Sequence, residues 1–455
     1  MIVLAQLTVL FEATTFNLAL PYVRADLHLD LGGPFSLPTV RGLAFGAVLL
    51  LGGHLADLVG RRRTLIVGLA GFAVASVLGG AAPTPTTLTM AFALQGVFAA
   101  LLTPSALALV STGFTDPKER RRALGIYVAI SVGGAALTMP VAGSLMEQLD
   151  WRVCEYAAVP LAVIALAGAL TLVHDRPGGS GASFDLPGVL LGCGAVAALT
   201  VGLDRARTLG WTSPLVLVLL VAGPLLLAAF WRWQTRASSP LVAPYVLKDR
   251  SRVGGHLALI LSGAAVFALT TALDFYLRAI RGYAPAAAGV AFLPLGLAIV
   301  VGATQVSARL LDRTGPRALI VAGLVTAACG LALLTALTAG GGYATQVLPG
   351  MLLGGVGLGT AFMPLFALAT DAVAPQHSGG ASAAVTTTQQ LGPVLGSALL
   401  SAVFATRLDA WPSGGAVGGS PAAFGCAAAG ALLAALLAGL LITARKAATG
   451  QPARR

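Results

Sequence analysis

The stretch IVLAQLTVLFEATTFNLALPYV (residues 2–23) is an apolar run of about 20 residues, the length that one helix needs to cross a lipid bilayer. Similar runs recur along the whole 455-residue chain, which is 57% hydrophobic and only 10% charged. Soluble domains carry about 25% charged residues. The long Leu, Val and Ala runs contradict the alternating strands of a β-barrel. The sequence therefore predicts an all-α polytopic membrane protein.

Fourteen transmembrane helices are expected, at residues 2–23, 36–57, 64–82, 86–112, 122–146, 155–174, 186–205, 213–233, 254–278, 284–310, 317–338, 345–371, 379–404 and 421–444. An even number returns both termini to one side of the membrane. Basic residues concentrate on that side, as in Arg61 to Arg63 and the segment KERRR (118–122). By the positive-inside rule this side is the cytoplasm. The net charge of +11 therefore reflects topology and does not indicate nucleic-acid binding.

Residue types that carry enzyme chemistry are scattered. The four cysteines form no CxxC pair, and the five histidines lie far apart. Zinc-protease, nucleophile-elbow and Walker motifs are missing from the sequence. We therefore expect no enzyme, no metal, no cofactor and no ATP-driven transport by this chain. A membrane-embedded enzyme stays as the alternative outside the transport class.

A short internal sequence repeat suggests two related halves. The segment LADLVGRRR follows the second span and LLDRTGPRA follows the tenth, so Asp57 and Gly60 correspond to Asp312 and Gly315. Parallel repeats of six-helix bundles are a known transporter architecture, with substrate bound between the halves. We expect a six-helix bundle over 1–175, two inserted helices with cytoplasmic connectors over 176–252, and a second six-helix bundle over 253–455.

The segment GHLADLVGRRR (53–63) is similar to the G-x-L-A-D-R-x-G-R-R signature of the major facilitator superfamily. Gly53 is expected to permit close helix approach, and Gly60 a tight reversal. Asp57 can accept hydrogen bonds from the N-terminus of a neighbouring helix. The resemblance implies that Arg61 and Arg62 hold an inner gate. These residues are expected to set topology and conformational balance and to contact no substrate.

The other matches point to the fourteen-span drug:proton antiporter branch and cover essentially the whole chain. FEATTFNLALP (11–21) resembles L-D-x-T-I-V-N-V-A-L-P, and WRVCEYAAVP (151–160) resembles W-R-W-x-F-x-x-N-x-P. GWTSP, SPLVAPYVLKDR and GYAPAAAGVAFLP resemble further marks of the branch.

Three segments depart from the branch pattern. Phe92 in FALQG stands where an arginine linked to proton coupling is usual. Gln389 stands at another common arginine position. The span-5 antiporter signature reads GAALTMPVAG, from Gly134 to Gly143, with its proline displaced to Pro140. These departures leave open a uniporter or importer without proton antiport.

Two acids, Glu12 and Asp274, are expected inside the membrane. Removal from water favours the neutral acid, so such a carboxyl can bind and release a proton. The alternative for Glu12 is a structural carboxyl packed between helices, and for Asp274 an interfacial ion pair with Arg278. Arg41 either reaches the headgroups or supplies the cation missing at position 92.

The resemblance thus implies a bacterial inner-membrane exporter of hydrophobic or amphipathic small molecules that works by alternating access, in exchange for protons and as a monomer. Its partners are the substrate, protons and the lipid bilayer. A cavity with few fixed charges suits amphipathic or lipophilic cationic compounds better than sugars or phosphates. The residues expected to line it are Phe16, Asn17, Gln95, Thr271, Phe275, Tyr276, Gln305, Phe362, Phe366 and Gln389.

Overall fold

A computed structural model describes residues 1–27, 37–114, 116–172, 184–237, 239–242, 244, 249–338, 340–371, 373–408 and 419–443. Most of the expected connector between the sixth and seventh spans lies outside this range. So does the basic C-terminal tail. The described residues form helices, turns and short connections, without a β-strand among them.

The helices follow one another in three sets. The first set comprises α1 (Ile2–Asp26), α2 (Leu37–Val59), α3 (Arg61–Gly80), α4 (Pro85–Thr112), α5 (Pro117–Gln148) and α6 (Trp151–Leu172). The second is a hairpin of α7 (Leu186–Leu209) and α8 (Pro214–Gln234). The third comprises α10 (Arg250–Phe275), α11 (Pro285–Val301), α12 (Ala308–Thr314), α13 (Pro316–Leu334), α14 (Leu348–Thr370), α15 (Ser378–Leu408) and α16 (Gly419–Leu441).

Three π-helical turns and one 3₁₀ turn belong to the third set. The π-helical turn η1 (Tyr276–Ile280) extends α10, η2 (Gly302–Ser307) joins α11 to α12, and η3 (Tyr343–Val347) precedes α14. The 3₁₀ turn η4 (Pro375–His377) precedes α15. Residues 285–314 therefore form one long helical span.

Local sequence explains where many of the helices begin. The side chains of Thr84, Asp116 and Asp249 accept hydrogen bonds from backbone N–H groups at the starts of α4, α5 and α10. Proline occupies the first or second position of several helices, where its missing N–H has no helical partner to lose. These prolines include Pro85, Pro117, Pro214, Pro285 and Pro316.

The structure confirms the fourteen-helix membrane fold. Within the described residues, thirteen helices are long and apolar enough to cross a membrane. The remaining long helix is α15, which has 31 residues and carries the polar run Thr386 to Gln390. The expected spans lie within a few residues of the observed helices. The largest differences are of four or five residues, at the starts of α5, α6 and α10 and at the ends of α7, α12, α13 and α15.

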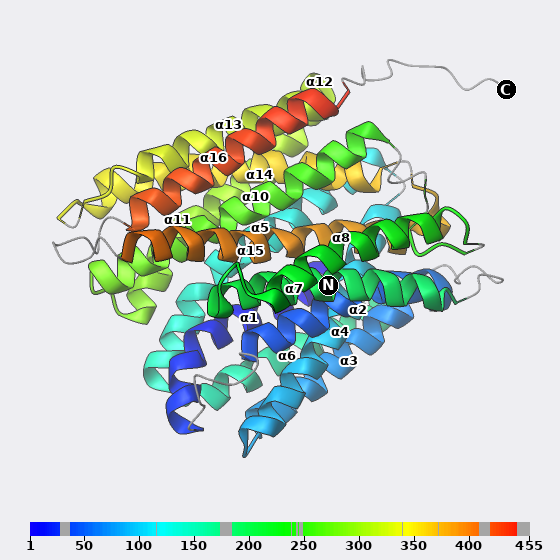
Figure 1. Cartoon of the computed structure of the whole chain (residues 1–455), viewed down its shortest axis with the longest axis horizontal. Helices are drawn as coiled ribbons and strands as arrows, with labels where there is room; N and C mark the ends of the chain where they lie inside the picture. The colour runs from blue at the N-terminus through cyan, green and yellow to red at the C-terminus, as the bar shows by residue number, and fades with distance from the viewer. Residues whose placement is uncertain are drawn as a thin grey trace.

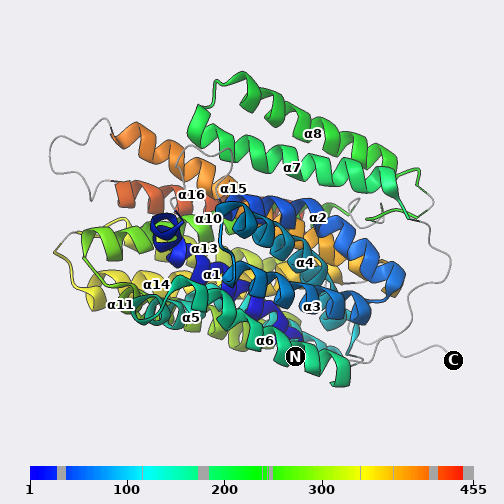
Figure 2. The same ribbon diagram turned by 90° about the horizontal axis from the view of Figure 1, so that it is seen from below.

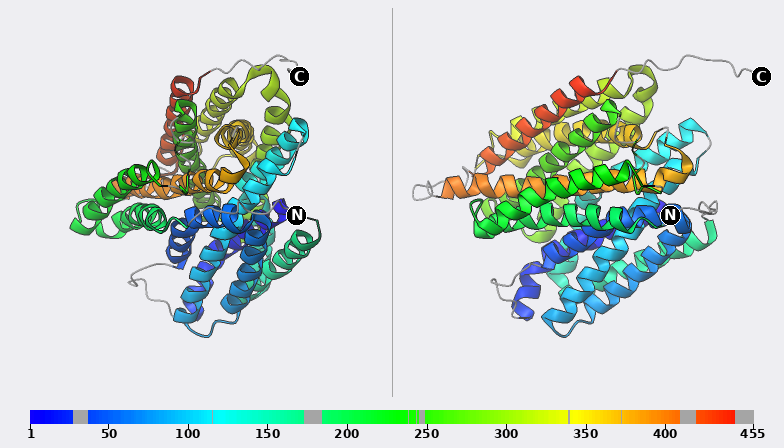
Figure 3. Two further views of the ribbon diagram at one scale, coloured as in Figure 1. Left: turned by 90° about the vertical axis from the view of Figure 1, so that its right-hand side faces the viewer. Right: turned by 45° about the vertical axis from the view of Figure 1, so that its right-hand side comes forward.

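The six helices α1–α6 are here called the N-terminal group, and α10–α16 the C-terminal group. Most of these helices pack mainly within their own group, but α5 and α11 pack most extensively against each other. The groups meet where α5 packs against α11 and α14, and where α15 packs against α2 and α4. The α7–α8 hairpin contacts α2 and α15 from the side (Figures 1 and 2). Figure 3 shows the hairpin projecting beside α15. Helices of both groups therefore support the hairpin.

Candidate functional site

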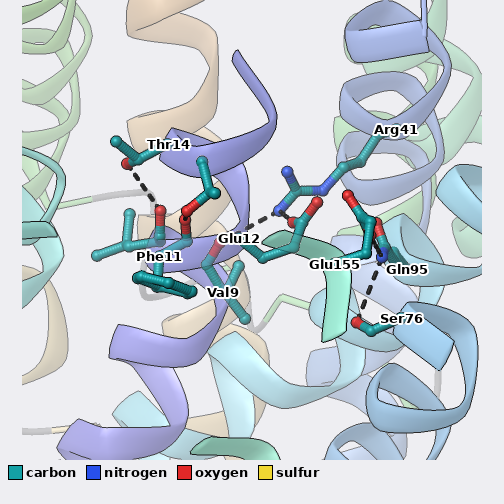
Figure 4. Close-up of polar contacts among 10 residues, drawn as sticks. Val9, Phe11, Glu12, Thr14, Arg41, Ser76, Gln95 and Glu155 are labelled. Atoms are coloured by element: carbon teal, nitrogen blue, oxygen red, sulfur yellow. Dashed lines mark hydrogen bonds and ion pairs between the residues drawn. The ribbon is translucent and has the colours of Figure 1, made fainter. Parts of the chain in front are cut away.

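Glu12 lies in the middle of α1 and is only 1% exposed. Its Oε2 forms an ion pair of 2.6 Å with an Nη atom of Arg41 on α2. The same guanidinium donates a hydrogen bond of 3.3 Å to the Val9 carbonyl (Figure 4). An unpaired charge at this depth is costly. Arg41 therefore compensates Glu12 and leaves the pair without net charge.

A second buried acid, Glu155 of α6, lies close to this ion pair and is also 1% exposed. Its Oε2 accepts a hydrogen bond of 2.8 Å from the side-chain amide of Gln95 on α4. The same amide nitrogen lies 3.3 Å from the Ser76 hydroxyl on α3. Glu155 also interacts electrostatically with Glu12 and Arg41. Figure 4 shows these side chains converging from different helices.

We call Glu12, Arg41, Ser76, Gln95 and Glu155 the polar cluster. Its members come from five helices of the N-terminal group, namely α1, α2, α3, α4 and α6. Two carboxyl groups and one guanidinium share a site from which water is largely excluded. Such a site can change its charge by one unit when a proton enters or leaves.

Sequence reasoning missed Glu155. The sixth span was expected to begin at residue 155, which made this acid an end residue. In the structure α6 begins at Trp151, so Glu155 lies about one turn inside the helix. The motif WRVCEYAAVP contained a signal, because the branch pattern has Phe at this position.

Phe92 occupies the position where the family pattern has arginine, and the structure packs it as a core residue. Its ring is fully buried and lies 4.1 Å, centroid to centroid, from the ring of Phe16. Phe16, expected to line the cavity, therefore packs against α4. A Cβ atom on Gly96 would lie 2.5 Å from the Arg41 carbonyl oxygen, so α2 and α4 touch here. The cation beside Glu12 comes from α2.

Asp274 lies elsewhere. Its carboxylate is 3.7 Å from the Arg278 guanidinium, four residues further along the chain. Both side chains are about one-third exposed. This geometry corresponds to the interfacial ion pair that was the alternative interpretation of Asp274.

The segment Gly53–Arg63 joins the two groups at one end of the bundle, here called the basic end. The Asp57 carboxylate accepts hydrogen bonds of 2.8 and 2.9 Å from the backbone N–H groups of Gly379 and Gly380. These are in the first turn of α15, so Asp57 binds the N-terminus of a helix from the other group, as expected. A Cβ atom on Gly53 would collide with Ala383 and with the Gly379 carbonyl.

The turn after Asp57 has the geometry that the sequence predicts. Gly60 has φ 106°, a conformation that favours glycine, and it precedes α3 directly. Arg61 donates a 2.8 Å hydrogen bond to the Thr112 hydroxyl. Arg62 donates hydrogen bonds to the carbonyls at the end of α6, including that of Ala169 at 3.1 Å. Both arginines anchor the turn within the N-terminal group.

The corresponding segment of the second half, residues 310–318, forms a related contact. Gly315 has φ 76° and precedes α13, as Gly60 precedes α3. Asp312 pairs with Arg121 of α5 at 2.7 Å. Asp57 thus connects α2 to α15, and Asp312 connects the corresponding helix of the C-terminal group to α5. A further ion pair, Arg120 with Asp371 at 3.2 Å, joins the groups at the same end.

The antiporter-like segment of α5 contacts two helices. Gly134 faces Leu10 of α1. A Cβ atom on Gly143 would lie 2.5 Å from the Pro285 carbonyl oxygen, at the start of α11. Opposite it, a Cβ on Gly289 would lie 2.8 Å from the Pro140 Cα. Gly143 and Pro140 therefore lie in the close contact between the two groups.

The other residues expected to line a cavity are dispersed. The Tyr276 hydroxyl donates a 2.8 Å hydrogen bond to the Thr338 carbonyl, and its ring is buried in the C-terminal group. Phe362 and Phe366 are buried 6.5 Å apart on α14. Gln389 and Phe275 are partly buried, whereas Asn17, Thr271 and Gln305 are exposed.

Two hollows among the described residues lie elsewhere. One, of about 650 Å³, borders α13 and α16, and another, of about 400 Å³, borders α3 and α4. Neither is lined by a residue of the expected cavity, so the substrate contacts remain predictions.

A bundle of membrane-length helices in two groups, with buried charges inside one group and paired contacts between them, is typical of membrane transport proteins. The chain belongs to the Major Facilitator Superfamily, whose family model matches residues 2–397. It is a multi-pass membrane protein of a transporter family and not an enzyme.

Relatives agree with this assignment. The chain is 46% identical to "Puromycin resistance protein pur8" of Streptomyces alboniger, over 99% of this chain and 92% of that protein. It is 35% identical to "Cephamycin export protein CmcT" of Amycolatopsis lactamdurans, over 92% of this chain and 85% of that protein. These relatives are consistent with the fourteen-span drug:proton antiporter branch and with a bacterial inner membrane.

Solved structures share the fold. The human organic anion transporter MFSD10 (TETRAN) superimposes with a TM-score of 0.67 at 14% identity, over 96% of this chain and 98% of that chain. At this identity the likeness shows the fold alone.

Proposed function

We propose that this protein exports hydrophobic or amphipathic small molecules, antibiotics among them, from the cytoplasm in exchange for protons. The observation that carries export is the 46% identity to a puromycin resistance protein over nearly the whole chain. A second relative, at 35% identity, is named as a cephamycin exporter. Similarity at this level over both six-helix sets favours a shared mode of transport.

Proton coupling is supported by the polar cluster. A membrane protein rarely keeps ionisable groups in its apolar interior unless they serve a function, proton relays among them. Glu12 and Glu155 are buried beside one guanidinium, Arg41, in the group that carries the first span. A carboxyl in such a site can load a proton from the outer side and release it to the cytoplasm. Arg41 then supplies the cation that is missing at Phe92.

Alternating access is supported by the contacts at the basic end. Asp57 with Gly379 and Gly380, Arg120 with Asp371, and Arg121 with Asp312 all join the two groups there. With this end in the cytoplasm, as the positive-inside rule directs, these contacts close the inner gate. Both termini are then cytoplasmic. Opening requires these hydrogen bonds and ion pairs to break together.

We further propose that 1–175, 176–252 and 253–455 are the structural units and that the monomer is the transporting form. Most helices of each six-helix group pack mainly within that group, one buried apolar core runs through both groups, and the hairpin contacts both. Transport by one chain needs only movement of the two groups about the site between them.

The test uses the purified protein in proteoliposomes with an imposed pH gradient, and radiolabelled puromycin as the first probe within a panel of antibiotics and dyes. We expect movement of the probe against the proton flow, and Glu12→Gln should abolish the gradient-driven part while leaving membrane insertion intact. Glu119→Gln, an exposed acid in the first turn of α5, is the matched control. Transport that ignores the gradient would support the uniporter alternative. Normal gradient-driven transport by Glu12→Gln would remove Glu12 from the mechanism.

A further inference from the structure

The polar cluster contains two carboxyl groups and one permanent cation. The Arg41 guanidinium stays protonated in proteins. If Glu12 and Glu155 were both ionised, the cluster would carry one net negative charge inside the membrane. A buried charge without a partner is strongly unfavourable. One proton shared by the two acids makes the cluster neutral, so the cluster holds one exchangeable proton.

The hydrogen-bond and ion-pair partners of Glu12 and Glu155 differ, and this difference indicates which of the two acids holds the proton. Glu12 faces a guanidinium at 2.6 Å, which stabilises the ionised form only. Glu155 faces the amide of Gln95 at 2.8 Å. An amide N–H can donate to a carboxylate oxygen and equally to the carbonyl oxygen of a neutral acid. Gln95 therefore suits a carboxyl that alternates between two charge states.

The observed arrangement of Gln95 is compatible with a neutral Glu155. The amide nitrogen faces the Glu155 Oε2, and the carbonyl oxygen of a neutral acid accepts an N–H as a carboxylate oxygen does. Glu155 can therefore gain or lose its proton without a rearrangement of Gln95.

The charged groups that interact with Glu155 across helices are Glu12 of α1 and Arg41 of α2. Arg152, one turn before Glu155 on α6, is paired with Asp26 and Asp150. The α3 helix contributes the Ser76 hydroxyl and Gly79, where a Cβ atom would lie 3.0 Å from the Glu155 Oε2. The α4 helix contributes Gln95, and α6 itself places the Cys154 thiol next in the chain. Among the described charged groups that interact with Glu155, Arg41 is thus the one cation, and Glu12 already holds it.

We propose that Glu155 carries the exchangeable proton in this conformation, while Glu12 remains an ionised partner of Arg41. As a coupling role, this rests on the proton exchange proposed above. Release breaks the O–H bond of Glu155 and passes the proton to water. The carboxylate left behind gives the cluster one negative charge, which favours a substrate with a cationic group. Glu155 and Glu12 then compete for Arg41.

The proton can be located by infrared difference spectroscopy of the full-length protein in lipid nanodiscs, between acidic and alkaline buffer. We expect the wild type to show a carboxylic acid C=O band that is lost on alkalinisation. Glu155→Gln should remove this band, and Glu155→Asp should shift its frequency. Glu12→Asp should leave the band in place, because Glu12 is ionised. Thermal unfolding checks that each variant is folded, and Glu155→Asp retains the carboxyl if Glu155→Gln is unstable.

The proposal is overturned if neither Glu155 substitution changes the band, or if Glu12→Asp shifts it instead. In proteoliposomes with radiolabelled puromycin, Glu155→Gln should lose all stimulation by the pH gradient while exchange of probe at equal pH stays measurable. Retained stimulation would overturn the coupling role. A wild type that ignores the gradient would defeat the proposed proton exchange. The infrared bands would still decide separately where the proton lies.

Discussion

Replacing Asp57 by asparagine should weaken the contact between α2 and α15 and open the basic end. Asp57 accepts two hydrogen bonds, of 2.8 and 2.9 Å, from N–H groups of the first turn of α15. Asparagine has the same shape but keeps one acceptor oxygen, and its amide NH₂ then faces an N–H. The variant loses one hydrogen bond to a charged group, worth about 1.5–3 kcal/mol. It also loses the favourable placement of a negative charge at a helix N-terminus, about 0.3–1 kcal/mol.

These terms overlap, so a shift of about 2–3 kcal/mol against the closed basic end is expected. At about 1.4 kcal/mol per tenfold change, this is roughly 30- to 150-fold in the equilibrium between closed and open forms. The measurement is a distance distribution between spin labels at Arg63 and Gln376, both exposed at the basic end, in a background without native cysteines. The long-distance population should grow in Asp57→Asn.

Asp312→Asn is the matched control. Asp312 occupies the corresponding position in the repeat, but its side chain is 58% exposed and pairs with the partly exposed Arg121. Exposed ion pairs contribute about 0–1 kcal/mol, so the shift should stay below about fivefold. An unchanged distribution in Asp57→Asn, or an equal shift in both variants, would refute the assignment of Asp57 as the main inter-group contact.

Two further predictions concern the Glu12–Arg41 ion pair and the contact of Gly53 with α15. Exchanging the charges of Glu12 and Arg41 should restore part of the transport and stability lost in each single charge reversal, because breaking a buried pair costs about 3–5 kcal/mol. Transport in vesicles and thermal unfolding measure the rescue. No rescue would mean that the ion pair is dispensable. Gly53→Ala should destabilise the contact with α15 by about 1–3 kcal/mol through overpacking. Gly42→Ala is the control, because its Cβ would meet open space. Similar thermal unfolding of the two variants would contradict this prediction.

Length and composition were sufficient to predict the helices, because a membrane span needs about 20 apolar residues whatever its neighbours are. The segment Gly53–Arg63 was predictable in detail for a related reason. A glycine at positive φ and a carboxylate at a helix N-terminus are local requirements. The residue types of Gly60 and Asp57 therefore predict their local geometry.

Which face of each helix lines a cavity and which packs against a neighbouring helix was harder to predict. Helices in lipid are apolar on all sides, so periodicity does not separate a cavity-facing side chain from one packed on a neighbour. Tyr276 was expected to line a cavity, yet its hydroxyl binds the Thr338 carbonyl within the C-terminal group. Glu155 was discounted because a span boundary uncertain by a few residues moved it to the helix end. Its partners on α3 and α4 are distant in sequence, so only the fold brings them together.

One helix links the polar cluster to the basic end, and this gives the final prediction. Arg41 and Asp57 are both on α2, so the rise of 1.5 Å per residue puts them about 24 Å apart along the axis. If Glu155 holds its proton while the basic end is closed, protons bind the closed form more tightly than the open one. Ligand binding shifts an equilibrium toward the form that it prefers, so the closed fraction should rise as the pH falls.

One proton can change this equilibrium by at most about tenfold per pH unit. The label distances at Arg63 and Gln376, measured over a pH series, should follow this sign in the wild type and in Asp57→Asn. The pH dependence should vanish in Glu155→Gln, which cannot bind the proton. A pH response of equal size in Glu155→Gln, or a closed fraction that falls on acidification, would show that the cluster and the basic end are not linked through this proton.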